Sequence, residues 1–272
     1  MKWQRKLWLS LVYTLGTKNY AKKVFREASK EELRYFTRRA IEKHFVPKKE
    51  GTGKKCLLSP SLRYSLHVTP YETSKGYWDY TRGEVYDTQG QEGKGVKIAD
   101  VKRNYSMFPF EWVEGHPDGH DYLVCGEDYQ GQTVIQLDTG KRVDTEDNQW
   151  GFCWAKIDAS PSKDVLAVSG CYWGGPYEVV LFDFADPMKV PHPEIVRANN
   201  RIYDDAVWGE DGSISLVQEV MVRSSDKKPY DDLSAEEQRE LDEMDDDGGT
   251  EEITVTSKWD STEFEAFRKK AR

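Results

Sequence analysis

The chain repeats a short β-sheet pattern, and this repeat constrains its fold more than any other feature. The segment around Pro117 matches the segment around Pro161, and a third, partial copy follows near Asp211. Between the first two copies, the coinciding positions are Pro117 and Pro161, Val124 and Val168, Gly126 and Gly170, Ile135 and Val179, and Leu137 and Leu181. In the third copy, Leu216 and Val217 coincide with Leu123 and Val124 of the first. Such a repeat indicates a supersecondary unit that buries its apolar face by stacking on copies of itself.

The residues between the turns alternate as half-buried β-strands do. The predicted strands are 63–69, 83–88, 96–101, 122–125, 133–138, 165–169, 178–183 and 253–257. Turn-forming residues such as Asp118-Gly119 and Asp211-Gly212 separate them. Short strands without intervening helices predict a mainly β protein, an antiparallel meander of small propeller-like or open blade-like sheets.

One copy of the repeat is similar to a known structural unit. The turn at Ser160 and Pro161, the strand after it and the later strand ending at Asp183 resemble one blade of a WD40 or TolB-type β-propeller. The resemblance covers about residues 105–257, although no WD dipeptide closes each copy. It implies four-stranded, blade-like units from a fold class that uses as few as four blades, and residues 62–104 can supply a further one.

The first 55 residues are strongly basic, whereas the whole chain has a net charge of −9. Residues 1–46 predict amphipathic helices, so we expect a basic helical arm, 1–55, before a β domain, 56–272. The arm can dock on the acidic body, pack on a second copy of the chain as a homo-oligomer, or bind nucleic-acid phosphates. The residues that would contact nucleic acid are Arg34, Arg38, Arg39 and Lys43.

An acidic insertion, 226–252, interrupts the third copy of the repeat. Within it, Ser234 followed by Glu237 forms a capping box that predicts a short exposed helix. After the closing strand, Asp260 or Ser261 is expected to cap a short C-terminal helix.

The loops at equivalent places of the repeat carry aromatic residues beside carboxylates. If the copies superpose, Tyr129 and Trp173 become neighbours at one rim of the sheets. Exposed rings of this kind suit stacking on a sugar, a base or a peptide side chain, but they can also pack between the sheets. The candidate ligand- or partner-binding residues are Glu127, Asp128, Tyr129, Tyr172 and Trp173.

Two further groups contain residues that could carry chemistry. His116, His120 and Asp121 are ligand types that zinc accepts, although the intervening Pro117-Asp118-Gly119 turn also suits a solvated hairpin. Glu127 and Asp128 could act in acid/base catalysis only if their loop bends, because adjacent strand residues point to opposite faces. No cofactor is expected from either group.

The four cysteines, Cys56, Cys125, Cys153 and Cys171, lack metal-ligand spacing and predict free thiols in a reducing cytoplasm. The first 16 residues faintly resemble a signal peptide, but no small-residue cleavage site follows them. No apolar stretch approaches the length of a transmembrane segment.

The leading hypothesis is a non-catalytic interaction module that binds a partner protein or a small ligand through the aromatic loop rim. A second hypothesis is a nucleic-acid-associated protein that uses the basic arm. The third is a metal-dependent hydrolase whose site lies between His116 and Tyr129. We favour a protein that is not an enzyme, because no complete catalytic signature lies on the repeated scaffold.

Overall fold

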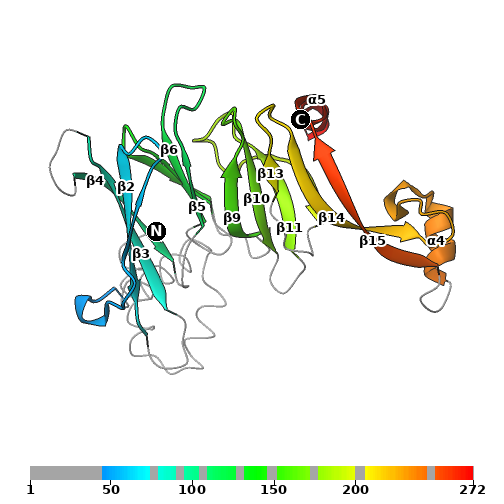
Figure 1. The fold of residues 1–272 in the computed structure, drawn as a ribbon, viewed down its shortest axis with the longest axis horizontal. Coiled ribbons are helices and arrows are strands. Elements are labelled where there is room, and N and C mark those ends of the chain that lie inside the picture. Colours follow the sequence, from blue (N-terminus) through cyan, green and yellow to red (C-terminus); the bar gives the residue numbers. More distant parts are fainter. Residues whose placement is uncertain are drawn as a thin grey trace, which may run out of the picture. The chain divides into compact units, whose positions relative to one another are not determined.

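The computed structural model describes residues 45–73, 79–89, 95–103, 109–126, 132–145, 152–171, 177–199, 206–243 and 249–271. These residues are mainly β, and their strands form four antiparallel sheets that follow one another along the chain (Figure 1). The predicted antiparallel meander is therefore confirmed. Each sheet is open, so the propeller arrangement stays a prediction. The basic arm was predicted over 1–55, with helices within 1–46; residues 1–44 lie outside the described residues, and Phe45 and Val46 are not helical.

We number the sheets in chain order. Sheet 1 contains β1 (Lys55–Leu58), β2 (Tyr64–Tyr71), β3 (Tyr80–Asp87) and β4 (Val96–Arg103). Sheet 2 contains β5 (Phe110–Val113), β6 (Tyr122–Cys125), β7 (Thr133–Gln136) and β8 (Lys141–Asp144). Sheet 3 contains β9 (Cys153–Ala159), β10 (Val165–Cys171), β11 (Tyr177–Asp183) and β12 (Glu194–Asn199). Sheet 4 contains β13 (Val207–Trp208), β14 (Ile214–Arg223) and β15 (Thr250–Trp259).

The sequence repeat corresponds to the second and third strands of successive sheets. Gly126 directly follows β6, and its N–H donates to the carbonyl of Pro109 at 3.0 Å; Gly170, in β10, pairs with Trp154 of β9. A Cβ atom would come within 2.9 Å of Pro109 Cγ at Gly126 and within 2.2 Å of the Cys153 carbonyl oxygen at Gly170. Both glycines thus lie where a second strand passes close to the start of the first strand of its sheet.

The chain divides into two compact units. The described part of the first unit holds sheet 1, together with a short 3₁₀-helix, η1 (Pro47–Lys49). The second unit holds sheets 2 to 4, the 3₁₀-helix η2 (Tyr230–Asp232) and the two helices α4 (Ala235–Glu243) and α5 (Ser261–Ala271).

Sheet 3 is buried on both of its faces. In β10, Leu166 and Val168 join a core cluster with residues of sheet 2, whereas Val165 and Ala167 join a second cluster with residues of sheet 4. The same alternation continues along β11. Strands buried on both faces require continuous apolar runs, which explains the sequences VLAV and VVLF in these two strands. Each large apolar side chain buried in this way contributes about 1.5–3 kcal/mol.

Capping boxes begin both α-helices of the described chain. The N–H groups of Thr262 and Glu263 donate to Asp260 Oδ1, and the N–H of Asp260 donates to Glu263 Oε2. At α4, Ser234 and Glu237 exchange the same two hydrogen bonds. Both predicted helices are therefore confirmed. Phe264 of α5 is buried in the second core cluster, which fixes the helix on sheets 3 and 4.

The acidic insertion lies at the end of a long hairpin. Strands β14 and β15 pair without interruption over their ten-residue lengths, from Ile214 with Trp259 to Arg223 with Thr250. Helix α4 lies beyond this end of the hairpin (Figure 1). Arg223 ties the insertion to the strands, because its guanidinium donates to Glu237 at 3.0 Å and to Asp226 at 2.7 Å.

No helix in the described ranges is long and apolar enough to cross a membrane.

Candidate functional site

A pocket of about 350 Å³ lies between the turn after β11 and helix α5. This volume is near the lower limit for sites that hold small molecules or single side chains. The lining residues are Asp183, Ala185, Asp186, Lys189, Pro193, Glu194, Ile195 and Arg268. The wall therefore combines three carboxylates with two cationic groups.

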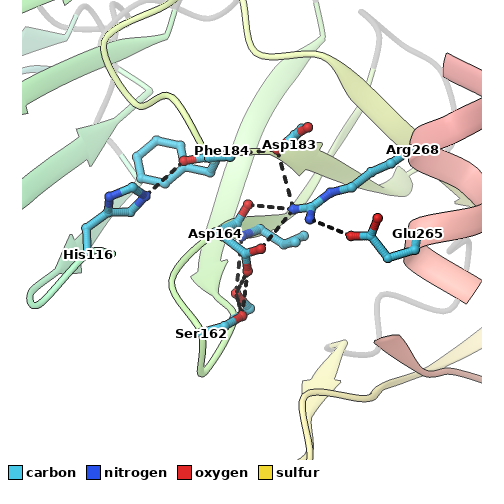
Figure 2. Close-up of polar contacts among 10 residues, drawn as sticks. His116, Ser162, Asp164, Asp183, Phe184, Glu265 and Arg268 are labelled. Carbon is cyan, nitrogen blue, oxygen red and sulfur yellow. Dashed lines mark hydrogen bonds and ion pairs between the residues drawn. The ribbon is translucent and has the colours of Figure 1, made fainter. Parts of the chain in front are cut away.

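Arg268 of α5 is one of the lining residues, and it binds carboxylates from both sheet 3 and its own helix (Figure 2). Its guanidinium donates to the carbonyl of Asp164 at 3.0 Å and to its carboxylate at 3.1 Å, and it lies 3.4 Å from Asp183 Oδ1. Glu265 accepts a further hydrogen bond at 3.1 Å. Burial alone would lower the pKa of Arg268, but these carboxylates raise it above its ordinary value. The arginine is therefore a permanent cation that three carboxylates already neutralise.

The surroundings of the pocket keep an excess of negative charge. Arg197 of β12 is ion-paired with two carboxylates, Glu178 and Glu194, so this arginine is also more than neutralised. Asp186 and Lys189 contribute one charge of each sign. Since each of the two arginines faces more carboxylates than it can balance, the site favours a positively charged group over a negative one.

A half-buried carboxylate between sheets 2 and 3 has a strongly raised pKa. Glu111 of β5 pairs with Val124, one of the residues that pack against sheet 3. Burial, followed by repulsion from Asp158, raises the pKa of Glu111 to about 7, although its carboxylate accepts the N–H of Ala159. A carboxylate with this pKa can take up and release a proton near neutrality, which is the property required of a general acid or base.

His116 is part of the packing between sheets 2 and 3. Its side chain is only 1% exposed, its Nε2–H donates to the carbonyl of Phe184 at 3.1 Å, and its ring lies edge-on to Phe184 and Tyr122 (Figure 2). On the other side of the ring, Nδ1 lies 2.9 Å from Oδ1 of Asp118. Both ring nitrogens of His116 therefore have partners within the protein.

His120 and Asp121, the other candidate zinc ligands, have separate structural roles. His120 Nδ1 lies 2.8 Å from Asp138 and 2.9 Å from the amide of Gln136. Asp121 accepts the N–H of Gly115 at 2.9 Å. The part of the chain that the structure describes contains no group of three or more His, Cys, Asp or Glu residues able to hold a metal ion.

His192 is a second buried histidine that contacts Phe184, and the sequence did not indicate it. His192 Nδ1 lies 3.0 Å from Gln132 Oε1 of sheet 2, and its Nε2 lies 3.1 Å from the carbonyl of Pro187. Its ring packs on Phe184 with centroids 4.9 Å apart. The turn between β11 and β12 is thus fixed to sheet 2 by two histidines, His116 and His192, which both contact Phe184.

One face of sheet 1 carries a row of polar residues. Four residues are direct neighbours in the strand register, in the order Cys56, His67, Glu84 and Asp100. Arg82 and Lys97 bind the two carboxylates, with the shortest distances 2.8 Å to Asp100 for both cations. Burial would raise the pKa of Asp100, but hydrogen bonds from Lys97 and Arg82 lower it. The sequence alone does not indicate this row, because only the strand register brings its members together.

The remaining candidate residues lie outside the described residues. They are Glu127, Asp128, Tyr129, Tyr172 and Trp173 of the aromatic loops, and Arg34, Arg38, Arg39 and Lys43 of the basic arm. The ends of the flanking strands show that each aromatic loop connects the second strand of a sheet to the third, between β6 and β7 and between β10 and β11. The two loops therefore occupy equivalent places in the repeat.

No protein-family model matches this chain. Among curated proteins, the chain is similar to an uncharacterized protein of Acanthamoeba polyphaga mimivirus, with 40% identity over 148 residues. The matching region is 54% of this chain and 57% of the viral protein. The chain thus spans little more than half the length of this relative.

Proposed function

We propose that this protein is a non-catalytic interaction module, in which stacked blade-like sheets hold a surface that binds a partner protein or small ligand. The burial of sheet 3 on both faces is the observation that carries this proposal. When both faces of a sheet are used for packing, its loops and the ends of its strands remain for binding.

The chemistry of the pocket beside α5 supports a cationic ligand group. Arg268 and Arg197 are already surrounded by carboxylates, and Asp186 is exposed. A lysine or arginine side chain of a partner peptide would gain from this excess of negative charge and would fit a volume of about 350 Å³. We therefore expect a basic peptide segment as the preferred ligand.

The aromatic loop rim is a second binding surface within the same proposal. The loop that holds Tyr172 and Trp173 precedes β11, whereas the pocket follows β11 at Asp183. Since a strand of this length extends roughly 20 Å, the two surfaces would lie at opposite ends of the strand. Variants at one surface should therefore leave the other surface intact.

The experiment measures fluorescence anisotropy of a labelled arginine-rich peptide and of a matched glutamate-rich peptide. We expect the arginine-rich peptide alone to bind, and the double variant Asp186→Lys and Glu194→Lys to weaken binding at least about tenfold, because the charge of the pocket is reversed. The double variant Tyr129→Ala and Trp173→Ala should leave this binding unchanged and thus serves as the matched control. Melting temperatures of all variants establish that they are folded.

Two outcomes would contradict the assignment. Equal binding of both peptides at low salt would show that the pocket does not select charge. Loss of binding in the Tyr129→Ala and Trp173→Ala variant, with the pocket variant unaffected, would move the binding surface to the aromatic rim.

A further inference from the structure

Cys56 and His67 form a thiol–imidazole pair in sheet 1. They are directly opposed in the antiparallel pairing of β1 and β2, and Cys56 Sγ lies 3.6 Å from His67 Nε2. Cys56 is exposed. An accessible thiol therefore lies within contact distance of a nitrogen that can accept its proton.

Neighbouring side chains hold the imidazole in this orientation. The hydroxyl of Ser65 lies 3.1 Å from His67 Nε2, and the ring of Tyr86 meets the imidazole edge-on, with centroids 5.0 Å apart. On the next strand, Glu84 is the register partner of His67. The Ser65 hydroxyl and the Tyr86 ring thus restrain the imidazole with its Nε2 edge directed toward the thiol.

The other three cysteines are in different environments. Cys125 and Cys153 are buried, and Cys171 is half-buried. Burial, and then the charge of Glu178, raises the pKa of the Cys171 thiol, which disfavours its thiolate. Among the four cysteines, Cys56 is thus the one that combines exposure with a neighbouring base.

We propose that Cys56 and His67 form a reactive thiol site that undergoes exchange with low-molecular-weight disulfides such as glutathione disulfide. His67 Nε2 takes the thiol proton, and the Cys56 thiolate attacks one sulfur of the disulfide. The disulfide bond of the reagent breaks as the bond to Cys56 forms, and the leaving thiolate takes the proton back from the imidazolium. One disulfide is consumed and one is formed, so no further oxidant is required.

This site lies in sheet 1, far along the chain from the pocket beside α5, and it is independent of the proposed binding function. The modification would attach a charged peptide to an exposed edge strand, since β1 is the outermost strand of its sheet. It would thus change the charge and shape of this edge reversibly.

The test follows the reaction of the full-length protein with a chromogenic aromatic disulfide and with glutathione disulfide between pH 6 and 9. Mass spectrometry of peptides identifies the modified residue. We expect a single fast-reacting thiol at Cys56, which the Cys56→Ser variant lacks. The His67→Gln variant should react about tenfold more slowly at pH 7, with a rate profile displaced to higher pH.

His120→Gln is the matched control, because this imidazole binds Asp138 and not a thiol; it should leave the rate unchanged. The wild-type rate profile provides a measurement that does not depend on the folding of any variant. A Cys56 profile that coincides with that of free glutathione would overturn the proposal. An unchanged rate in a folded His67→Gln variant would do the same.

Discussion

Sheets 1 and 3 are both four-stranded antiparallel meanders, yet they use their faces differently. In β11 of sheet 3, the consecutive residues Leu181 and Phe182 are both buried, in opposite core clusters. In β2 of sheet 1, Leu66 is fully buried, whereas the next residue, His67, lies on the polar face with Cys56.

The difference shows where chemistry can reside in a stacked β protein. In β10 and β11, the two central strands of the sheet that is buried on both faces, consecutive residues all pack, so polar groups lie toward the strand ends, as at Glu178 and Asp183. A sheet with one polar face can bring reactive groups together through register alone, as at Cys56 and His67.

The largest expected effects come from alanine substitutions at adjacent residues in the two sheets. Leu181→Ala and Phe182→Ala should each lower the free energy of unfolding by about 3 kcal/mol, since each leaves a cavity in a different core cluster. In sheet 1, Leu66→Ala should cost a similar amount, whereas His67→Ala should cost less than about 1 kcal/mol. Urea unfolding followed by tryptophan fluorescence measures all four variants.

Two results would contradict this difference between the faces of sheets 1 and 3. If Leu66→Ala and His67→Ala lowered the free energy of unfolding equally, sheet 1 would also be packed through both faces. If either Leu181→Ala or Phe182→Ala left the free energy of unfolding nearly unchanged, sheet 3 would not be packed through both faces.

The next effect concerns Glu111, the carboxylate that sheet 2 places beside sheet 3. It has a folded pKa of about 7 against an ordinary value of 4.5. Between these two pH values the folded state holds a proton that the unfolded state loses, so the free energy of unfolding falls as the pH rises through this window. The decrease in the free energy of unfolding is complete above pH 7 and amounts to at most about 3 kcal/mol.

Glu111→Gln should remove this loss of stability at high pH, because glutamine does not ionise, while its side-chain oxygen can still accept the N–H of Ala159. We expect the variant to be more stable than the wild type at pH 8 and nearly equal to it at pH 4. Thermal melts across this range provide the measurement. A wild-type stability that rises between pH 4.5 and 7, with no change of slope in Glu111→Gln, would contradict the assignment.

A smaller effect is expected at the junction of α5 with sheet 3. Arg268→Met leaves Asp164 and Asp183 without their shared cation and should cost about 2 kcal/mol, less than for a fully buried ion pair because Asp164 is partly exposed. Glu265→Ala, at an exposed partner of the same arginine, should cost less than about 0.5 kcal/mol. Equal losses for the two variants, measured by urea unfolding, would show that Arg268 does not act through the sheet.

Alternation and turn chemistry were sufficient to predict much of the fold from the sequence. The predicted strand 122–125 coincides with β6, and 178–183 differs from β11 by one residue. The predicted strand 133–138 extends too far, because β7 ends at Gln136 and a turn follows, in which the N–H of Gly140 donates to the carbonyl of Gln136. The first strands of sheets 1 and 2 were missed, because each is four residues long and, unlike the fully buried β6, neither has a uniform or strictly alternating burial pattern.

The candidate site residues were harder to predict from the sequence, because their contacts depend on strand register and on how α5 and the sheets pack together. The pair of Cys56 and His67 requires the pairing of β1, a strand that the sequence analysis did not include. The contact of Arg268 with Asp164 joins residues 104 positions apart and depends on how α5 packs. At His116, the residue type alone did not distinguish a zinc ligand from a buried ring between two sheets.

The long hairpin of sheet 4 has a practical consequence for engineering. The predicted insertion, 226–252, extends too far, because Thr250, Glu251 and Glu252 belong to β15. The chain leaves the paired strands after Arg223 and returns at the directly opposed Thr250, so the length of the segment between them can change without altering the register below it. Peptide tags or fluorescent labels placed near α4 would therefore be carried on a stem whose base is anchored in the core. A protein labelled there would have a reporter position at the far end of the hairpin from Trp259, the residue that directly precedes the cap of α5.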